Sequence, residues 1–113
     1  MSIQRGEVYE VHPDPSVGKE IQKKRPCIVV SDNVFNASSP LAVVVPLTDA
    51  AGKSPDVLHV WVLRKEGGLS KDSIALCDQL KAVDQTRIDQ KLGNISADTM
   101  AKITLGMKRV LSL

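Results

Sequence analysis

The sequence has 113 residues, enough for one domain with its own hydrophobic core, spanning 1–113, and too few for two such domains. Apolar residues make up 42% of it and charged residues 25%, which are ordinary values for a globular protein and exclude disordered and fibrous classes. A net charge of only +2 gives no general basic excess, so nucleic-acid binding would require a local cluster of cations.

The cysteines and the apolar runs indicate the compartment. Cys27 and Cys77 each lie within an apolar run, without a CxxC spacing or a nearby histidine, so we expect buried thiols in a reducing environment. The amino-terminal stretch has no apolar signal core, and no apolar run approaches the roughly 20 residues that span a bilayer. We therefore expect a cytoplasmic protein without a metal site or a membrane anchor.

Five segments within the first 93 residues have the composition of β-strands. They are short, rich in Val and Ile, and separated by turn residues, which favours strands over helices. The segment over 73–84 is expected to bend or bulge, and Gly67 and Gly68 supply the turn before it. The predicted strands are RGEVYEV (5–11), PCIVVSD (26–32), LAVVVPL (41–47), VLHVWVL (57–63) and SIALCDQLKAVD (73–84).

The last segment changes its apolar period and predicts a carboxy-terminal helix. Ser96 is a good N-cap and Asp98 suits the first turn, whereas Gly106 weakens the helix by about 1 kcal/mol relative to alanine. The expected fold is mainly β, a five- or six-stranded curved antiparallel sheet or small barrel closed by this helix. The apolar stripe of the helix consists of Met100, Ile103, Met107, Val110 and Leu111.

The stretch VGKEIQKKRPCIVV (17–30) gathers four cations and one acid, Glu20, at the start of a predicted core strand. It belongs to a long loop over 12–24, and a second long loop covers 48–56. Long loops on a small rigid scaffold commonly carry function. If the flanking strands are neighbours, Arg25 and Thr48 come close together. The four cations are Lys19, Lys23, Lys24 and Arg25.

These residue types suit a phosphate site. The Arg25 guanidinium matches phosphate oxygens, Thr48 adds a hydroxyl donor, and Glu20 is available as a base, which together allow metal-free RNA cleavage by the substrate's own 2′-hydroxyl. The plainer interpretation is a solvated loop, with Glu20 in a salt bridge and Thr48 as a strand-end hydrogen bonder. His12 is expected to be exposed at a strand end and His59 to pack beside Trp61.

RGEVYEV, the pattern P-x-x-G-x-E-x-x-x-x-R-P before an aliphatic strand, VVVPLT and SIALCDQLKAVD occur in an order that resembles the MazF/PemK toxins of toxin–antitoxin modules. The resemblance covers essentially the whole chain. It implies a small SH3-like barrel of the CcdB/MazF/Kid type, a homodimer, and a cognate MazE-like antitoxin. It also implies sequence-specific, cofactor-independent cleavage of single-stranded mRNA, which leaves a cyclic phosphate and a 5′-hydroxyl.

The resemblance also assigns roles to individual residues. Arg25 and Thr48 take the catalytic positions, with Glu20 as the loop glutamate. Two departures are Ile21 and Lys23, which replace a glutamine and a glycine of the family's loop. One branch of the family has a histidine in place of Lys19 and an arginine in place of Leu76, which favours the Arg25 and Thr48 arrangement here. The implied RNA contacts are Arg5, Lys19, Lys23, Asp78 and Gln79.

Two alternatives remain open from the sequence. A gyrase-poisoning toxin of the CcdB kind shares the barrel but acts through the end of its helix, whereas this chain ends Val110-Leu111-Ser112-Leu113 and keeps the nuclease loop. A homologue that binds RNA or antitoxin without cutting is the second alternative, because the loop glycine is replaced.

Overall fold

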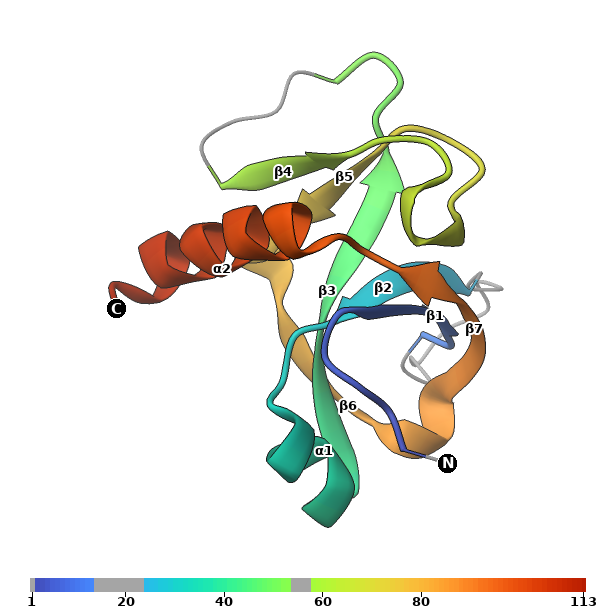
Figure 1. The fold of residues 1–113 in the computed structure, drawn as a ribbon, viewed down its shortest axis with the longest axis vertical. Coiled ribbons are helices and arrows are strands. Elements are labelled where there is room, and N and C mark those ends of the chain that lie inside the picture. The colour runs from blue at the N-terminus through green and yellow to red at the C-terminus, as the bar shows by residue number, and fades with distance from the viewer. Residues whose placement is uncertain (1, 14–23, 54–57) are drawn as a thin grey trace, which may run out of the picture.

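The computed structural model describes residues 2–13, 24–53 and 58–113, and in these ranges it has a seven-stranded antiparallel sheet with a long carboxy-terminal helix (Figure 1). The sheet order is β4-β5-β3-β2-β1-β7, and β6 also pairs with β3. The strands are β1 (Glu7–Val11), β2 (Arg25–Val29), β3 (Leu41–Asp49), β4 (His59–Val62), β5 (Ser73–Leu76), β6 (Lys81–Asp84) and β7 (Ile88–Asn94). The helices are α1 (Asn33–Ser38) and α2 (Ala97–Leu111).

Strand β3 is nine residues long and organises the sheet. One edge pairs with β2, and the other pairs first with β6 and then with β5. Between the pairs Val44–Lys81 and Leu47–Ala75, β3 advances three residues and its partner six. The three-residue excess is taken up by a 3₁₀ turn, η2 (Cys77–Gln79), so the predicted bulge over 73–84 is confirmed.

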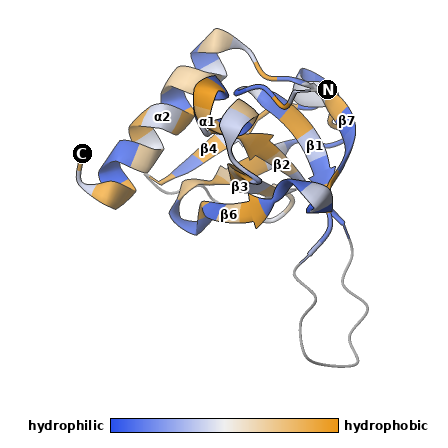
Figure 2. Cartoon of the chain, turned by 90° about the horizontal axis from the view of Figure 1, so that it is seen from below, coloured by the Kyte–Doolittle hydropathy of each residue, from blue (hydrophilic) through white to orange (hydrophobic). Residues whose placement is uncertain are grey.

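The strands bury side chains on both faces of the sheet, which explains their nearly continuous apolar runs. On one face, a core that includes Val8, Ile28 and Val45 packs against Ile103 of α2. On the other face, Tyr9, Cys27 and Val44 belong to a second core. Figure 2 shows the corresponding hydrophobic segments in β2, β3 and β6. Both cysteines are buried and free, as expected.

Helix α2 begins where the sequence predicted. The Ser96 side chain caps it by accepting a hydrogen bond from the Thr99 N–H at 3.2 Å. Met100, Ile103 and Met107 pack on the core, but Leu111 is 49% exposed, so the predicted apolar stripe is wrong in its last turn. Gly67 and Gly68 form the predicted turn, and a Cβ on Gly68 would lie 1.9 Å from the Leu92 carbonyl oxygen of β7.

Two elements and the strand count differ from the sequence prediction. Helix α1 was missed, although Asp32 caps it by accepting from the Val34 N–H at 2.9 Å. Strand β7 was missed because its sequence, IDQKLGN, is largely polar. With β7 and the division of 73–84, the sheet has seven strands rather than five or six. The mainly β fold with a terminal helix is confirmed, in a barrel-like sheet that remains open between β4 and β7.

Candidate active-site cleft

A cleft of about 980 Å³ opens at the end of the sheet where β1 and β3 finish and β2 and β5 begin. These four ends meet because neighbouring strands are antiparallel. Residues of β6 and the η2 turn complete its wall. Those with side chains of chemical interest are His12, Lys24, Arg25, Cys27, Thr48, Asp49, Lys71, Ser73, Gln79 and Lys81.

The strand register brings Arg25 and Thr48 to the same place. Cys27 pairs with Pro46 across β2 and β3, and two more residues in this register set Arg25 opposite Thr48 on one face of the sheet. Both residues line the cleft, Arg25 exposed and Thr48 half-buried. Pro26 restrains the backbone of Arg25 to its extended conformation, which directs the side chain. The predicted proximity of Arg25 and Thr48 is confirmed.

The Lys53 ammonium donates a hydrogen bond to the Thr48 hydroxyl oxygen at 3.3 Å. The hydroxyl proton of Thr48 therefore remains available for another acceptor. Within the described ranges, no ion pair joins Arg25 to another residue. An arginine fork and a hydroxyl donor consequently face the same space, an arrangement that suits a phosphate group.

Cations outnumber acids along the cleft, since four of them line it with one carboxylate, Asp49. The Asp49 carboxylate accepts from the Ala51 N–H at 2.9 Å and lies 3.4 Å from the Lys71 ammonium, and these contacts hold its pKa below the ordinary value. Lys24 forms ion pairs with Glu10 and Asp89. Arg25 and Lys81 have no such ion pair among the described residues, so the cleft retains positive charge for an anion.

Cys27 forms part of the cleft wall, and the residue is only 2% exposed. Burial raises the pKa of this thiol to about 11, although Lys81, Arg25 and Arg87 act in the opposite direction. A thiol with such a pKa stays protonated at neutral pH and is not a nucleophile. Cys27 therefore contributes packing rather than chemistry.

The other predicted site residues are distributed unevenly. Gln79 lines the cleft, whereas Asp78 is exposed beside it and lies 3.5 Å from the ring of His59. The Arg5 guanidinium lies outside the cleft lining, where it donates to the Val30 carbonyl and to the Thr104 hydroxyl at 2.9 Å. Glu20, Lys19 and Lys23 lie outside the described residues.

Two cleft cations were not singled out from the sequence, Lys71 and Lys81. Lys71 lies two residues before β5 and Lys81 begins β6, and the pairing of both strands with β3 brings these lysines to the same cleft as Arg25. His12 is exposed as predicted, and it also lines the cleft. In the described part of the chain, no three His, Cys, Asp or Glu side chains gather in a way that could hold a metal ion, and no helix is long and apolar enough to cross a membrane.

An open, barrel-like antiparallel sheet with a terminal helix and a cleft lined by cations defines a small, mainly β domain. More specifically, the chain belongs to the PemK-like, MazF-like toxins of type II toxin–antitoxin systems, because the model of that family matches residues 4–111. The resemblance that the sequence motifs carried is thereby confirmed.

Two curated relatives support this family assignment. Endoribonuclease EndoA of Bacillus subtilis (strain 168) is 30% identical over 113 residues, which is 100% of this chain and 97% of the relative. Endoribonuclease MazF of Staphylococcus epidermidis is 32% identical over 101 residues, 89% of this chain and 84% of the relative.

Solved structures support the fold. MazF of Deinococcus radiodurans aligns with a TM-score of 0.80 over 100% of this chain and 99% of that one, at 22% identity. A mycobacterial endoribonuclease in complex with its cognate antitoxin aligns with a TM-score of 0.77 over 99% and 95%, at 21% identity.

Proposed function

We propose that this MazF-like toxin–antitoxin endoribonuclease cleaves single-stranded mRNA in the cytoplasm at short sequence motifs without a metal cofactor. The observation that supports the mechanism is that Arg25 and Thr48 line the same cleft, where Arg25 has no ion pair with another described residue. The gyrase-poisoning alternative is not favoured, because the curated relatives are endoribonucleases.

In the proposed reaction, the RNA 2′-hydroxyl attacks the adjacent phosphorus while the bond from phosphorus to the 5′-oxygen breaks. A base takes the 2′ proton, and an acid gives a proton to the departing oxygen. The products are a cyclic phosphate and a 5′-hydroxyl. Negative charge grows on the two non-bridging oxygens, where the Arg25 fork and the Thr48 hydroxyl stabilise it. Glu20 is our candidate for the base.

The proposed RNA contacts extend beyond the reacting phosphate. Gln79 and Lys81 both line the cleft, which supports contacts of these two residues with the backbone or bases of a bound strand. Asp78 lies at the rim with His59. For Arg5, a role in binding competes with its hydrogen bonds to Val30 and Thr104. Lys19 and Lys23 complete the set of RNA contacts that we propose.

We further propose that a MazE-like antitoxin inhibits the chain and that the chain forms a homodimer. Relatives of known structure include MazE–MazF complexes of Deinococcus radiodurans. The excess of cations in the cleft suits an acidic segment of such a partner, which would exclude RNA by occupying the same surface. Large apolar side chains left exposed on β4 and α2 favour the dimer.

Substitution of the two central residues tests the mechanism. We expect Arg25→Ala and Thr48→Val each to lower the rate of RNA cleavage in EDTA by roughly 100- to 1,000-fold, the usual loss for one donor to a developing oxyanion. Both side chains lie at the cleft surface, so the variants should keep the melting temperature of the wild type. Lys102→Ala on the exposed side of α2 is the matched control for lost positive charge. Absence of wild-type cleavage on a mixed-sequence RNA would refute the proposal.

A further inference from the structure

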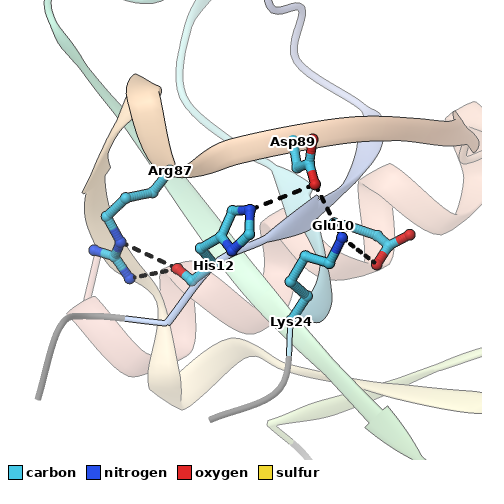
Figure 3. Close-up of polar contacts among 5 residues, drawn as sticks. All are labelled: Glu10, His12, Lys24, Arg87 and Asp89. Atoms are coloured by element: carbon cyan, nitrogen blue, oxygen red, sulfur yellow. Dashed lines mark hydrogen bonds and ion pairs between the residues drawn. The ribbon is translucent and has the colours of Figure 1, made fainter. Parts of the chain in front are cut away.

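A cluster of five charged or titratable side chains joins β1, β2 and β7 beside the cleft (Figure 3). The Asp89 carboxylate is its centre, because one oxygen lies 3.0 Å from the Lys24 ammonium and 3.4 Å from the His12 ring nitrogen Nε2. Glu10 lies 3.9 Å from the same ammonium. The proposed reaction uses neither Asp89 nor Glu10, so the cluster needs a separate explanation.

The cluster holds two short segments that border the cleft, the residue after β1 and the residue before β2. The guanidinium of Arg87 donates two hydrogen bonds to the His12 carbonyl oxygen, at 3.1 and 2.8 Å. In return the His12 N–H donates to the Arg87 carbonyl at 2.8 Å. The residue after β1 is therefore bound to the residue before β7, and Asp89 of β7 adds the side chains of His12 and Lys24 to this attachment (Figure 3).

The register explains why this attachment matters for Arg25. Val11 pairs with Arg25 across β1 and β2, so His12 and Lys24 form the next row at the rim of the cleft, and their side chains alternate with those of Val11 and Arg25. Lys24 is also joined to Arg25 by one planar peptide bond. A displacement of Lys24 consequently displaces the backbone from which the Arg25 side chain enters the cleft.

These ion pairs contribute little to stability, because the Lys24 and Asp89 side chains are 41% and 44% exposed. Their mutual contact nevertheless raises the pKa of Lys24 and lowers the pKa of Asp89, so both stay charged at neutral pH. The Lys24–Asp89 ion pair is therefore better suited to orienting the neighbouring backbone than to stabilising the fold.

We propose that Asp89 is a positioning residue that holds Lys24, the residue before β2, and thereby directs Arg25 toward the scissile phosphate. The inference rests on the proposed RNA cleavage. It differs from that function in assigning a role to a side chain that does not touch the substrate. Asp89 acts through Lys24, so its effect depends on the presence of that lysine.

Asp89→Asn is the test variant, since it keeps the shape of the side chain and removes its charge. We expect kcat for a single-site RNA to fall about 10- to 100-fold, the scale of a displacement of roughly 1 Å at a reacting centre. KM should stay the same or fall, because a negative charge is removed beside a cationic cleft. Asp89→Glu should restore part of kcat, and Asp98→Asn, an equal charge change on α2, should leave both constants unchanged.

A double-mutant cycle with Lys24→Met separates action through Lys24 from a general structural effect. We expect the double variant to be no slower than Asp89→Asn alone. A second readout, independent of cleavage, is the NMR signal of the Arg25 Nε–H group in the free protein, which should shift in Asp89→Asn and not in Asp98→Asn.

The possible results distinguish a failure of this inference from a failure of the proposed function. Unchanged kcat in Asp89→Asn with an active wild type, or additive losses in the cycle, overturns the inference and leaves the proposed function intact. An inactive wild type overturns the proposed function. In that case the Arg25 signal still decides the inference, which an unshifted signal in Asp89→Asn contradicts.

Discussion

At the scale of single residues, Glu7 combines burial with charge. It is 7% exposed, and its carboxylate accepts hydrogen bonds from the Lys91 ammonium at 2.7 Å, the Tyr9 hydroxyl at 2.9 Å and the Gln4 N–H at 2.6 Å. Burial alone would raise the pKa of Glu7, but these three donors outweigh it and the pKa is lowered. Burial and the Glu7 carboxylate raise the pKa of Tyr9 to about 12.

The lowered pKa of Glu7 gives a prediction about acid. Because the folded pKa lies below the unfolded one, the carboxylate stabilises the fold above the ordinary value near 4.5 and loses this effect as pH falls through the lowered pKa. We expect Glu7→Gln to lower the free energy of unfolding at pH 7 by about 1–3 kcal/mol. Below the ordinary carboxyl pKa, the free energy of unfolding of the variant should fall less steeply with decreasing pH than that of the wild type. Urea titrations from pH 7 to pH 3 measure the free energy of unfolding and its dependence on pH. An unchanged acid slope in Glu7→Gln would contradict this account.

The residues of the site were predictable only in part. Arg25 and Thr48 could be brought together from the sequence because each borders an aliphatic run long enough to be a core strand. Lys71 and Lys81 could not, since their position depends on a three-residue shift between two pairings of β3. His12 and Lys24 could be seen, but their shared partner Asp89 lies on a strand too polar to be recognised.

At the scale of elements, helix α2 contains Gly106, although glycine has a low helix propensity. A Cβ on Gly106 would lie 2.7 Å from the Cys77 sulfur and 3.2 Å from the Cys77 Cβ, so the helix packs directly on η2. Both residues are buried, and the Cys77 side chain has little freedom to move. The glycine therefore serves a close approach between two elements that the sequence alone did not reveal.

Gly106→Ala should consequently destabilise the protein, although alanine is the better helix former. We expect overpacking of about 1–3 kcal/mol to exceed the gain of about 1 kcal/mol in helix propensity. Thermal unfolding measures the result. Cys77→Ala removes the sulfur that the new methyl group meets, so the double variant should recover much of the loss. A higher melting temperature for Gly106→Ala alone would show that the helix can move away from η2.

Elements with strong local signals were predicted well. The five apolar segments became strands, and Ser96 marked the start of α2. The missed elements lack such signals, since α1 spans only six residues and β7 is held by its pairing with β1 rather than by its own apolar pattern. Turn glycines could be recognised, whereas the approach of Gly68 to β7 required knowledge of a strand that the pattern does not indicate.

At the scale of the whole molecule, apolar surface is left uncovered on β4 and α2. Strand β4 is at one end of the sheet order, and its Trp61 is 41% exposed. The neighbouring Leu63 is 61% exposed, as are Leu105 and Leu111 of α2 at 48% and 49%. Apolar surface of this kind on a small protein is typical of a subunit contact, which agrees with the proposed homodimer.

Sedimentation equilibrium tests the dimer. At micromolar concentration we expect a mass of about twice the 12.2 kDa of one chain. Leu63→Lys should shift the equilibrium toward the monomer, because it places a charge in the apolar surface. Val34→Lys, which changes a residue 75% exposed on α1, is the matched control and should leave the mass unchanged. A wild-type mass of one chain would contradict the dimer.

The central claim is that the cleft directs the RNA's own 2′-hydroxyl against the phosphate beside Arg25 and Thr48. The most direct measurement compares one RNA that contains a mapped cut site with the same RNA carrying a single 2′-deoxynucleotide on the 5′ side of that site, both in EDTA. The account predicts that the unmodified RNA is cut to a cyclic phosphate and a 5′-hydroxyl and that the modified RNA stays intact. Cleavage of both RNAs at equal rates, or products with a 5′-phosphate, would contradict it.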